Sequence, residues 1–292
     1  MAQTITIDGN AKINLTLDIL GKREDGFHEV AMVMQSIGLH DTLVLTRRED
    51  DAITLSIDVP FLKADEKNLA WRAAAAMMKA GRTKGVDIQL TKRIPIAAGL
   101  AGGSTDAAAV IRGMNELYGL GFSTERLCEI GAAIGSDIPF CIQGGTMLAT
   151  GRGEVLRRLP AMPPLWVVLA KPPVGVSTAW AYQNYDAEGA ERHPDNDAVI
   201  AALGEHDPKA VTSLLCNVLE SVTIKKYTVI SRYKQMMLDQ GALASMMSGS
   251  GPTVFGLTDT ESTARDIAAY LQAQTDAKVF VTQLAGENHE MR

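Results

Sequence analysis

Apolar and polar residues alternate along several segments of the chain, and this alternation predicts β-strands. A period of two residues is typical of a strand with one buried face. It appears first over residues 4–7 and 15–19. The same pattern, or a short apolar run between turn residues, predicts further strands at 39–46, 53–59, 86–90, 147–149, 165–170, 254–257 and 278–282.

Apolar residues spaced three and four apart predict helices between these strands. The clearest helix follows residue 103, where one face carries Ala107, Val110, Ile111, Met114 and Leu117. Similar spacing, or an alanine-rich run, predicts helices at 68–80, 123–134, around 182–185, at 208–215, 222–239 and 263–274. We expect the helix over 123–134 to end before Pro139, and the polar segment 188–197 to form a loop.

Prolines cluster where this periodicity lapses, over residues 157–164, and they mark the best candidate for a linker. We therefore expect an N-terminal domain of residues 1–158 and a C-terminal domain of residues 159–292. The strand–helix–strand order of the second half is consistent with an α+β fold.

Composition excludes several classes of protein. A hydrophobic fraction of 46% and a charged fraction of 21% are those of a globular protein, and a net charge of −6 argues against nucleic acid as a main partner. No apolar run approaches the roughly 20 residues of a membrane span, and the N-terminus lacks the pattern of a signal peptide. Three widely spaced cysteines favour a reducing compartment, so we expect a cytoplasmic protein.

Residues 95–105, P-I-A-A-G-L-A-G-G-S-T, are the strongest candidate for chemistry. Small residues let the backbone curve around a ligand, and the following helix directs its positive N-terminal end at the same point. Ser104 is the expected N-cap, and Asp106 suits the positive end of the helix. From the residues alone, a cradle for nucleotide phosphates and a tight turn before a core helix are equally good interpretations.

The segment lacks the lysine of a Walker A loop and the spacing of a dinucleotide fingerprint. It resembles instead the phosphate-binding motif of the GHMP kinases, a superfamily that includes galactokinase, homoserine kinase and mevalonate kinase. The form P-x-x-x-G-L-A-G-G-S-T-D-A-A-A is most similar to the motif of those GHMP kinases that phosphorylate a cytidyl-diphosphate alcohol in isoprenoid synthesis. In this resemblance the ATP-binding residues are Pro95, Ile96, Ala97, Ala98, Gly99, Leu100, Ala101, Gly102, Gly103, Ser104 and Thr105.

Lys12 lies in strand-like sequence, A-K-I-N-L. The pattern alone favours an edge-strand lysine that points to water. The string resembles the first motif of the family, and this resemblance implies a catalytic lysine that helps polarise the acceptor, with Asn14 as a substrate-binding residue.

Phe27 and His28 stand in a polar turn, D-G-F-H, where they could be a surface cluster or a stacking platform. The family signature D-G-Y/F-H implies the second, with contacts to the cytosine ring. Family members often place another aromatic near Met34, whereas this chain has M-V-M-Q-S there. Methionine can pack on a ring face in its place.

Asp137 follows a predicted helix in G-S-D-I-P-F. A lone aspartate at a helix end is usually a cap, but the string resembles the family motif whose aspartate is the catalytic base, typically worth 10²–10⁴-fold in rate. The turn S-G-S-G-P-T near residue 250 resembles the family segment that closes over the glycine loop. The string N-V-L-E at 217–220 departs from the family pattern N-D-L/F-E, which indicates a structural role.

Five motifs in family order imply the two-domain α+β GHMP kinase fold, with the active site in the cleft between the domains. They imply ATP and Mg²⁺ as cofactors, Ser104 as a possible Mg²⁺ ligand and Thr178 as a substrate contact. The alternatives are a homoserine- or mevalonate-type kinase, or a nucleotide sensor without turnover. As partners we expect only small molecules, with the protein a monomer or a weak homodimer.

Overall fold

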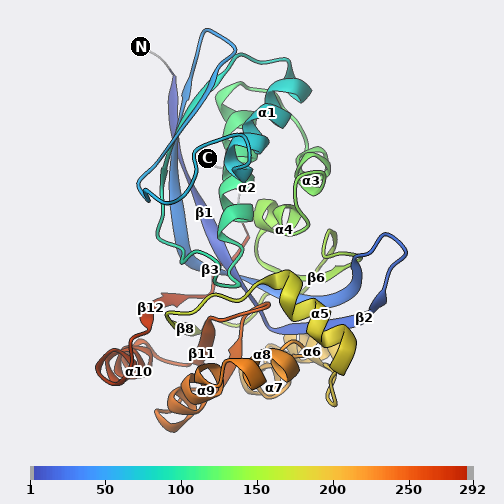
Figure 1. Ribbon diagram of the computed structural model, residues 1–292, viewed down its shortest axis with the longest axis vertical. Coiled ribbons are helices and arrows are strands. Elements are labelled where there is room, and N and C mark those ends of the chain that lie inside the picture. Colours follow the sequence, from blue (N-terminus) through green and yellow to red (C-terminus); the bar gives the residue numbers. More distant parts are fainter. Residues whose placement is uncertain (1–2, 288–292) are drawn as a thin grey trace.

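The computed structural model describes residues 3–287 and contains two sheets, one above the other in Figure 1. The upper sheet has eight strands in the order β4-β5-β3-β2-β9, with β1 and β6 also paired to β3, and β7 paired to β6. Its strands are β1 (Thr4–Asn14), β2 (Thr16–Lys22), β3 (His28–Arg47), β4 (Ile53–Ile57), β5 (Val86–Thr91), β6 (Thr146–Thr150), β7 (Val155–Arg158) and β9 (Cys216–Asn217).

Helices cover one face of the upper sheet (Figure 1). They are α1 (Leu69–Gly81), α2 (Gly102–Leu117), α3 (Thr124–Ala132) and α4 (Ile138–Gln143). The apolar face predicted for α2 is fully buried, as the spacing of its alanines and larger apolar residues requires. Asn68 caps α1, since its side chain accepts a hydrogen bond from the N–H of Ala70.

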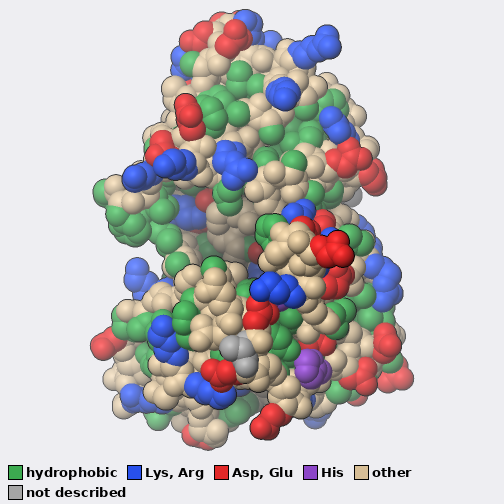
Figure 2. All heavy atoms as spheres, turned by 45° about the vertical axis from the view of Figure 1, so that its right-hand side comes forward, with side chains coloured by type: hydrophobic (Ala, Val, Ile, Leu, Met, Phe, Trp, Pro, Cys, Tyr) green, Lys and Arg blue, Asp and Glu red, His purple; other side chains and the backbone are tan. Residues whose placement is uncertain are grey.

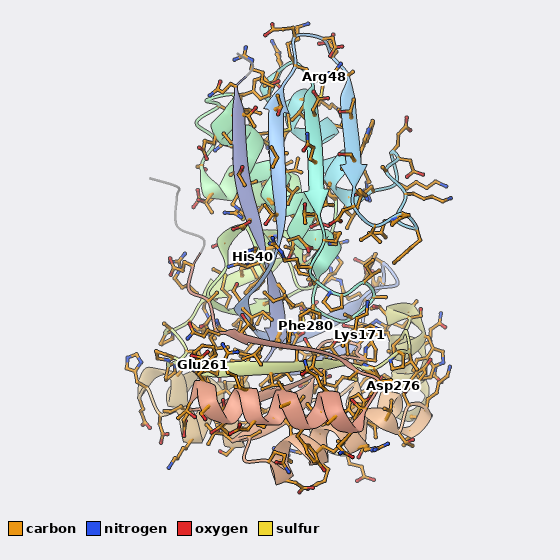
Figure 3. The ribbon with its side chains drawn as sticks, turned by 90° about the vertical axis from the view of Figure 1, so that its left-hand side faces the viewer. His40, Arg48, Lys171, Glu261, Asp276 and Phe280 are labelled. Atoms are coloured by element: carbon orange, nitrogen blue, oxygen red, sulfur yellow. The ribbon has the colours of Figure 1, made fainter. Side chains whose placement is uncertain are left out.

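The lower sheet has four strands in the order β10-β11-β8-β12, all antiparallel. They are β8 (Trp166–Lys171), β10 (Ala244–Met247), β11 (Val254–Thr258) and β12 (Lys278–Gln283). The helices of this half are α5 (Thr178–Glu188), α6 (Asn196–Gly204), α7 (Pro208–Ser213), α8 (Glu220–Lys226), α9 (Val229–Asp239) and α10 (Glu261–Gln274). Figure 3 shows α10 lying along this sheet between the labelled Glu261 and Asp276.

The two halves are joined by strand pairing as well as by the chain. The short strand β9 pairs in parallel with β2, with Thr16 opposite Cys216 and Leu17 opposite Asn217. After β12 the chain returns to the upper sheet, where Leu284 bridges to Ile37. Among residues 3–287, no helix is long and apolar enough to cross a membrane.

The α+β class predicted from the sequence is confirmed, but several element predictions were wrong. The predicted helix over 222–239 is two helices, because Tyr227 leaves the helical conformation where its ring packs edge-on against Trp180. Residues 196–204 form α6, a helix that was not predicted, and only its first two residues fall in the loop predicted over 188–197. Pro139 does not simply end a helix; it occupies the first turn of α4, where its missing N–H costs nothing.

Candidate active site

A cavity of about 890 Å³ lies between the two halves of the molecule. Figure 2 shows the surface hollowed at this level, between the upper and lower parts. Its lining includes Lys12, the glycine loop, Asp137, the hairpin tip at Phe27 and His28, and Thr178 and Ser250 from the C-terminal half. The motifs that are scattered along the sequence therefore meet around one space.

The glycine loop forms one wall of the cavity. Ala97, Gly99 and Ala101 all have positive φ angles, so the backbone turns sharply three times before α2 begins. The N-cap of α2 is Ala101, not Ser104 as predicted, and no side chain caps this end. The first helical N–H groups, those of residues 102–104, consequently have no partner one turn back in the helix.

Two predicted loop residues face away from the cavity. Thr105 is buried, its N–H donates to the carbonyl of Ala101 (2.9 Å) and its hydroxyl donates to the carbonyl of Asn10 (2.9 Å). Leu100 is buried in the core. Residues 95–99 and 101–104 do line the cavity. The exposed amides at the start of α2 form an anion site that suits phosphate oxygens.

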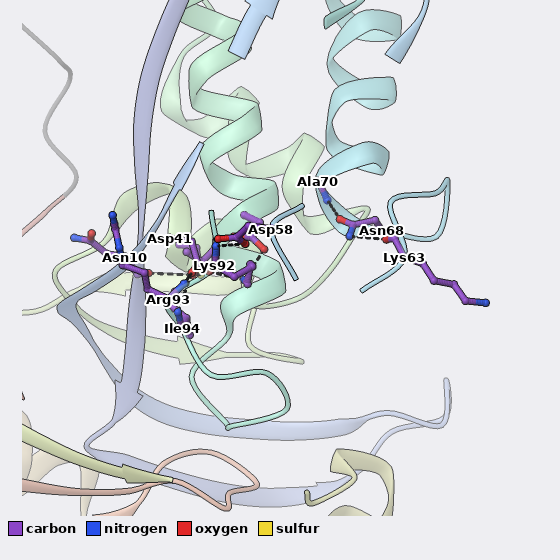
Figure 4. A network of polar contacts seen from close by, with 12 residues as sticks. Asn10, Asp41, Asp58, Lys63, Asn68, Ala70, Lys92, Arg93 and Ile94 are labelled. Atoms are coloured by element: carbon purple, nitrogen blue, oxygen red, sulfur yellow. Dashed lines mark hydrogen bonds and ion pairs between the residues drawn. The ribbon is translucent and has the colours of Figure 1, made fainter. Parts of the chain in front are cut away.

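A buried ion network supports the loop from behind (Figure 4). Lys92 Nζ donates to Asp41 and to Asp106 Oδ2 (2.7 Å), while the other oxygen of Asp41 accepts the N–H groups of Arg93 (2.6 Å) and Ile94 (2.8 Å). Burial and the neighbouring Asp41 raise the pKa of Asp106 against the opposing effect of Lys92. The network ties β3, the entry to the loop and the first turn of α2 together.

The second glycine turn is held by side chains of the N-V-L-E segment. Asn217 Nδ2 donates to the carbonyls of Met247 (2.9 Å) and Gly249 (2.8 Å), and Glu220 accepts the N–H of Met247 (2.8 Å). These contacts agree with the structural role predicted for this segment. They place Gly249 and Ser250 in the wall of the cavity.

Lys12 is buried, with 5% of its surface exposed, and it lines the cavity instead of pointing to water from a sheet edge. Its Nζ donates to Asn14 Oδ1 at 2.6 Å. Asn14 is fully buried and is not part of the cavity lining, so it orients Lys12 rather than presenting itself to a substrate.

Asp137 is half-buried at the N-terminus of α4 and its side chain makes no capping hydrogen bond. Within residues 3–287 its carboxylate has no hydrogen-bond or ion-pair partner, so both oxygens are available to the cavity. Burial, followed by the charge of Asp137, raises the pKa of the nearby Cys141 thiol to about 12, and Lys12 acts on the same thiol in the opposite direction. Lys12 and Asp137 therefore both lie near Cys141, and both line the same cavity.

The lining of the cavity also includes aromatic rings from both halves of the chain. Phe27 projects from the β2–β3 hairpin, half of its surface is exposed, and the guanidinium of Arg152 lies 5.0 Å from its ring centre. His28 packs against Tyr182 of α5, with ring centroids 4.8 Å apart. Thr178, in the first turn of α5, lies 3.0 Å from Ser250 between their hydroxyl oxygens.

Comparisons with known proteins agree with this site. Residues 68–145 match the family model described as GHMP kinases N terminal domain, and residues 199–277 match GHMP kinases C terminal. The 4-diphosphocytidyl-2-C-methyl-D-erythritol kinase of Geobacillus kaustophilus is 48% identical over 98% of this chain and 99% of its own length. The enzyme of the same name from Exiguobacterium sibiricum is 49% identical over 98% of this chain and 100% of its own.

The chain belongs to the 4-diphosphocytidyl-2-C-methyl-D-erythritol kinase family of GHMP kinases.

A crystal structure of 4-(cytidine 5'-diphospho)-2C-methyl-D-erythritol kinase superimposes on this kinase with a TM-score of 0.82, at 31% identity, covering 97% of this chain and 100% of that one. Homoserine kinase from Cytophaga hutchinsonii shares the fold, with a TM-score of 0.77 at 20% identity, covering 99% and 97%. The predicted two-domain GHMP kinase fold is confirmed.

Three cavity residues of this family member escaped sequence reasoning. Tyr182 was taken only as part of a helix, and Asp186 and Arg152 were assigned no role. Tyr182 is an aromatic ring of the cavity lining that packs against His28, whereas Met34 is fully buried in the core. The spacing of Thr178, Tyr182 and Asp186 at intervals of four on one helix was the available signal.

Proposed function

We propose that this protein transfers the γ-phosphoryl group of ATP to the 2-hydroxyl group of 4-diphosphocytidyl-2-C-methyl-D-erythritol, releasing ADP, in the non-mevalonate route to isoprenoid precursors. The observation that carries the proposal is one cavity lined by the glycine loop, a lysine, a carboxylate and two aromatic rings, in a chain 48% identical to a kinase of that name. Such a cavity can hold a polyphosphate at one end and a base at the other.

In this proposal the amides of residues 102–104 hold the phosphate tail of ATP, aided by the positive end of α2. Phosphoryl transfer depends mainly on positioning and on charge neutralisation. Lys12, oriented by Asn14, stabilises the negative charge that develops between acceptor and phosphate. Asp137 takes the proton of the attacking hydroxyl, for which its unpartnered carboxylate is suited.

The residues present fit a Mg²⁺ ion that is held chiefly by phosphate. Ser104 lines the cavity at the start of α2, and within residues 3–287 no group of three His, Cys, Asp or Glu side chains could bind a metal alone. Mg²⁺ prefers phosphate and water oxygens to a full protein cage, and when bound it neutralises phosphate charge. Ser104 would be its ligand from the protein.

Phe27, His28 and Thr178 are the proposed contacts to the substrate, with Tyr182 added as the second ring. The rings of Phe27 and Tyr182 would stack on cytosine, an interaction typically worth about 1–3 kcal/mol per base. Asn14, predicted as a substrate contact, acts instead through Lys12.

We also propose that the boundary between the N-terminal and C-terminal domains lies between residues 158 and 159. The strands of the lower sheet all follow residue 165, and those of the upper sheet precede residue 159 except for β9. A monomer or weak homodimer, and a cytoplasmic location inferred from the cysteine pattern, stay predictions.

A substrate panel tests the function. Purified protein and MgATP are given in turn 4-diphosphocytidyl-2-C-methyl-D-erythritol, homoserine and mevalonate, and ADP is measured. ADP release only with the cytidyl substrate supports the proposal. Turnover of homoserine or mevalonate would assign another kinase activity, and ATP binding without transfer to any alcohol would indicate a sensor.

A further inference from the structure

His28 and Asp186 form a polar contact that the proposed chemistry does not use. His28 begins β3 and Asp186 lies near the end of α5, and these elements lie beside each other in Figure 1. His28 Nε2 and Asp186 Oδ1 are 2.6 Å apart. The other carboxylate oxygen, Oδ2, accepts a hydrogen bond from Lys22 at 3.2 Å. Both Asp186 and His28 line the cavity.

This contact fixes which ring nitrogen carries the proton. Hydrogen bonds from His28 and then from Lys22 hold the pKa of Asp186 below its ordinary value, so the carboxylate is ionised at neutral pH and can only accept. Nε2 is therefore the nitrogen that donates its hydrogen in this contact. When the imidazole is neutral, this tautomer leaves a lone pair on Nδ1.

The remaining nitrogen is left for a ligand. Within residues 3–287, Nδ1 of His28 has no hydrogen-bond partner, although only 12% of the side chain is exposed. The ring itself is held by Tyr182, whose centroid is 4.8 Å away. With Nε2 engaged by Asp186 and the residue lining the cavity, Nδ1 is the ring nitrogen left for a ligand.

Cytosine and uracil differ in the atom that such an acceptor would meet. The exocyclic amine of cytosine donates, whereas the corresponding carbonyl oxygen of uracil only accepts. A neutral histidine that presents a lone pair therefore binds the amine and repels the carbonyl. A site rejects an analogue most strongly when the analogue leaves one of its buried polar groups without a hydrogen-bond partner. Uracil would do so here, because it places an acceptor against an acceptor.

We propose that Asp186 is a positioning residue for base specificity: by accepting from Nε2 it holds His28 in the tautomer whose Nδ1 selects cytosine over uracil. The inference rests on the proposed function, because it assumes that the base lies beside His28. Lys22 completes the arrangement by holding the second oxygen of Asp186, which stops the carboxylate from turning away.

The kinetic test compares the cytidyl substrate with its uridyl analogue. An asparagine at position 186 can donate to Nε2 and so favours the tautomer with a proton on Nδ1. We expect Asp186→Asn to lower the ratio of kcat/KM for cytidyl over uridyl substrate at least roughly tenfold, the net worth of one hydrogen bond or more. The change should appear in KM for the cytidyl substrate. The kcat value should stay within about twofold of that of the parent protein, since Lys12 and Asp137 are unchanged.

Glu188→Gln is the matched control. It removes another carboxylate from α5, the exposed partner of Lys225, and should leave the ratio unchanged. If Asp186→Asn weakened both substrates equally and preserved the ratio, Asp186 would be merely structural and the inference would be overturned.

A spectroscopic test is independent of turnover. Long-range ¹H–¹⁵N correlation spectra identify the protonated nitrogen of each neutral histidine, and a His28→Gln sample assigns the signal among the five histidines. We expect His28 to be protonated on Nε2 in the parent protein and to gain the Nδ1–H form in Asp186→Asn. An Nδ1–H form in the parent protein would overturn the inference.

The two proposals fail separately. Absence of turnover with the cytidyl substrate counts against the kinase function, but the tautomer can still be read. Calorimetry with CDP and UDP can also still show whether cytosine is preferred. Equal binding of CDP and UDP by a catalytically active protein would count against the role of Asp186 alone.

Discussion

Ser248 donates its hydroxyl hydrogen to the carbonyl oxygen of Gly99 at 3.0 Å, and this bond joins the two glycine turns across 149 residues of sequence. A Cβ atom built on Gly99 would lie 2.1 Å from the carbonyl oxygen of Ser248. The two turns can approach so closely only because position 99 has no side chain. The conformation of the glycine loop thus depends on its contact with the C-terminal half.

Gly99→Ala should disturb both stability and ATP binding. The φ angle of +74° is strained for alanine by about 1–2 kcal/mol, and the contact with a backbone oxygen adds to this. We expect a melting temperature several degrees lower and a raised KM for ATP, measured by calorimetry and by steady-state kinetics. Gly175→Ala is the control, because a Cβ there meets no atom within 4 Å. Parent-like KM and melting temperature in Gly99→Ala would contradict the proposed packing.

Asn217→Ala should loosen the second turn. Two buried carbonyls, those of Met247 and Gly249, would lose their donor, at a cost of about 1–3 kcal/mol for each group left unsatisfied. Urea unfolding should report the loss and the KM for ATP should rise. In Asn184→Ala, which removes one bond to the carbonyl of Trp180 within its own helix, the effect should be well under half as large. An equal effect in both variants would argue against a special role for Asn217.

How far the sequence predicts the fold depends on whether a segment buries one face or two. β3 shows this within one element. Over 39–46 it alternates and was predicted, but over 28–38 it was not, because Met32 and Met34 face one core while Val33 and Ile37 face another. Burial on both sides removes the period-two signal. α4 was missed because Pro139 was taken as an end rather than a beginning.

The site was predictable where a motif is contiguous and not where it depends on distant residues. The glycine loop, Lys12 and Asp137 could be found by resemblance to family motifs, and all of them line the cavity except Leu100 and Thr105 of the loop. The pairing of His28 with Asp186 spans 158 positions and depends on how α5 packs beside the β2–β3 hairpin. Sequence periodicity carries no information on such a contact. The same holds for Asn14, whose role becomes evident only from its bond to Lys12.

Lys92→Met should be strongly destabilising. It would leave the buried carboxyl groups of Asp41 and Asp106 without their cation, a change that typically costs about 3–5 kcal/mol. Urea denaturation measures the loss. Lys84→Met removes one partner of an exposed pair with Asp51 and should change stability by about 0–1 kcal/mol. A cost for Lys92→Met no larger than this control would refute the structural role of the network.

Asp50→Asn should lower stability at neutral pH but not in strong acid. Hydrogen bonds from Arg48 and then from the N–H of Ala52 lower the pKa of Asp50 from 3.8 to about 2. A carboxyl group whose pKa is lower in the folded state stabilises the fold above its unfolded pKa, and this stabilisation disappears as the pH falls through the folded value. The melting temperatures of parent and variant should therefore differ at pH 6 and converge between about pH 4 and pH 2. A difference that does not change with pH would exclude this cause.

Asp137→Asn and Lys12→Ala should largely abolish turnover while the fold and ATP binding persist. The asparagine cannot accept the proton of the attacking hydroxyl, so we expect kcat to fall about 10²–10⁴-fold. Lys12→Ala removes the charge that faces the transferred group, and it leaves the buried Oδ1 of Asn14 without its donor, so some loss of stability is expected as well. Calorimetry should show parent-like ATP affinity in both variants, because the amides of residues 102–104 are unchanged. This measurement separates a loss of turnover from a loss of the folded, ATP-binding protein. Asn14→Ala extends the test: since Asn14 acts only through Lys12, its effect on kcat should nearly vanish in the Lys12→Ala background. Near-parental turnover in purified Asp137→Asn would remove Asp137 as the base and leave the cavity without an assigned proton acceptor.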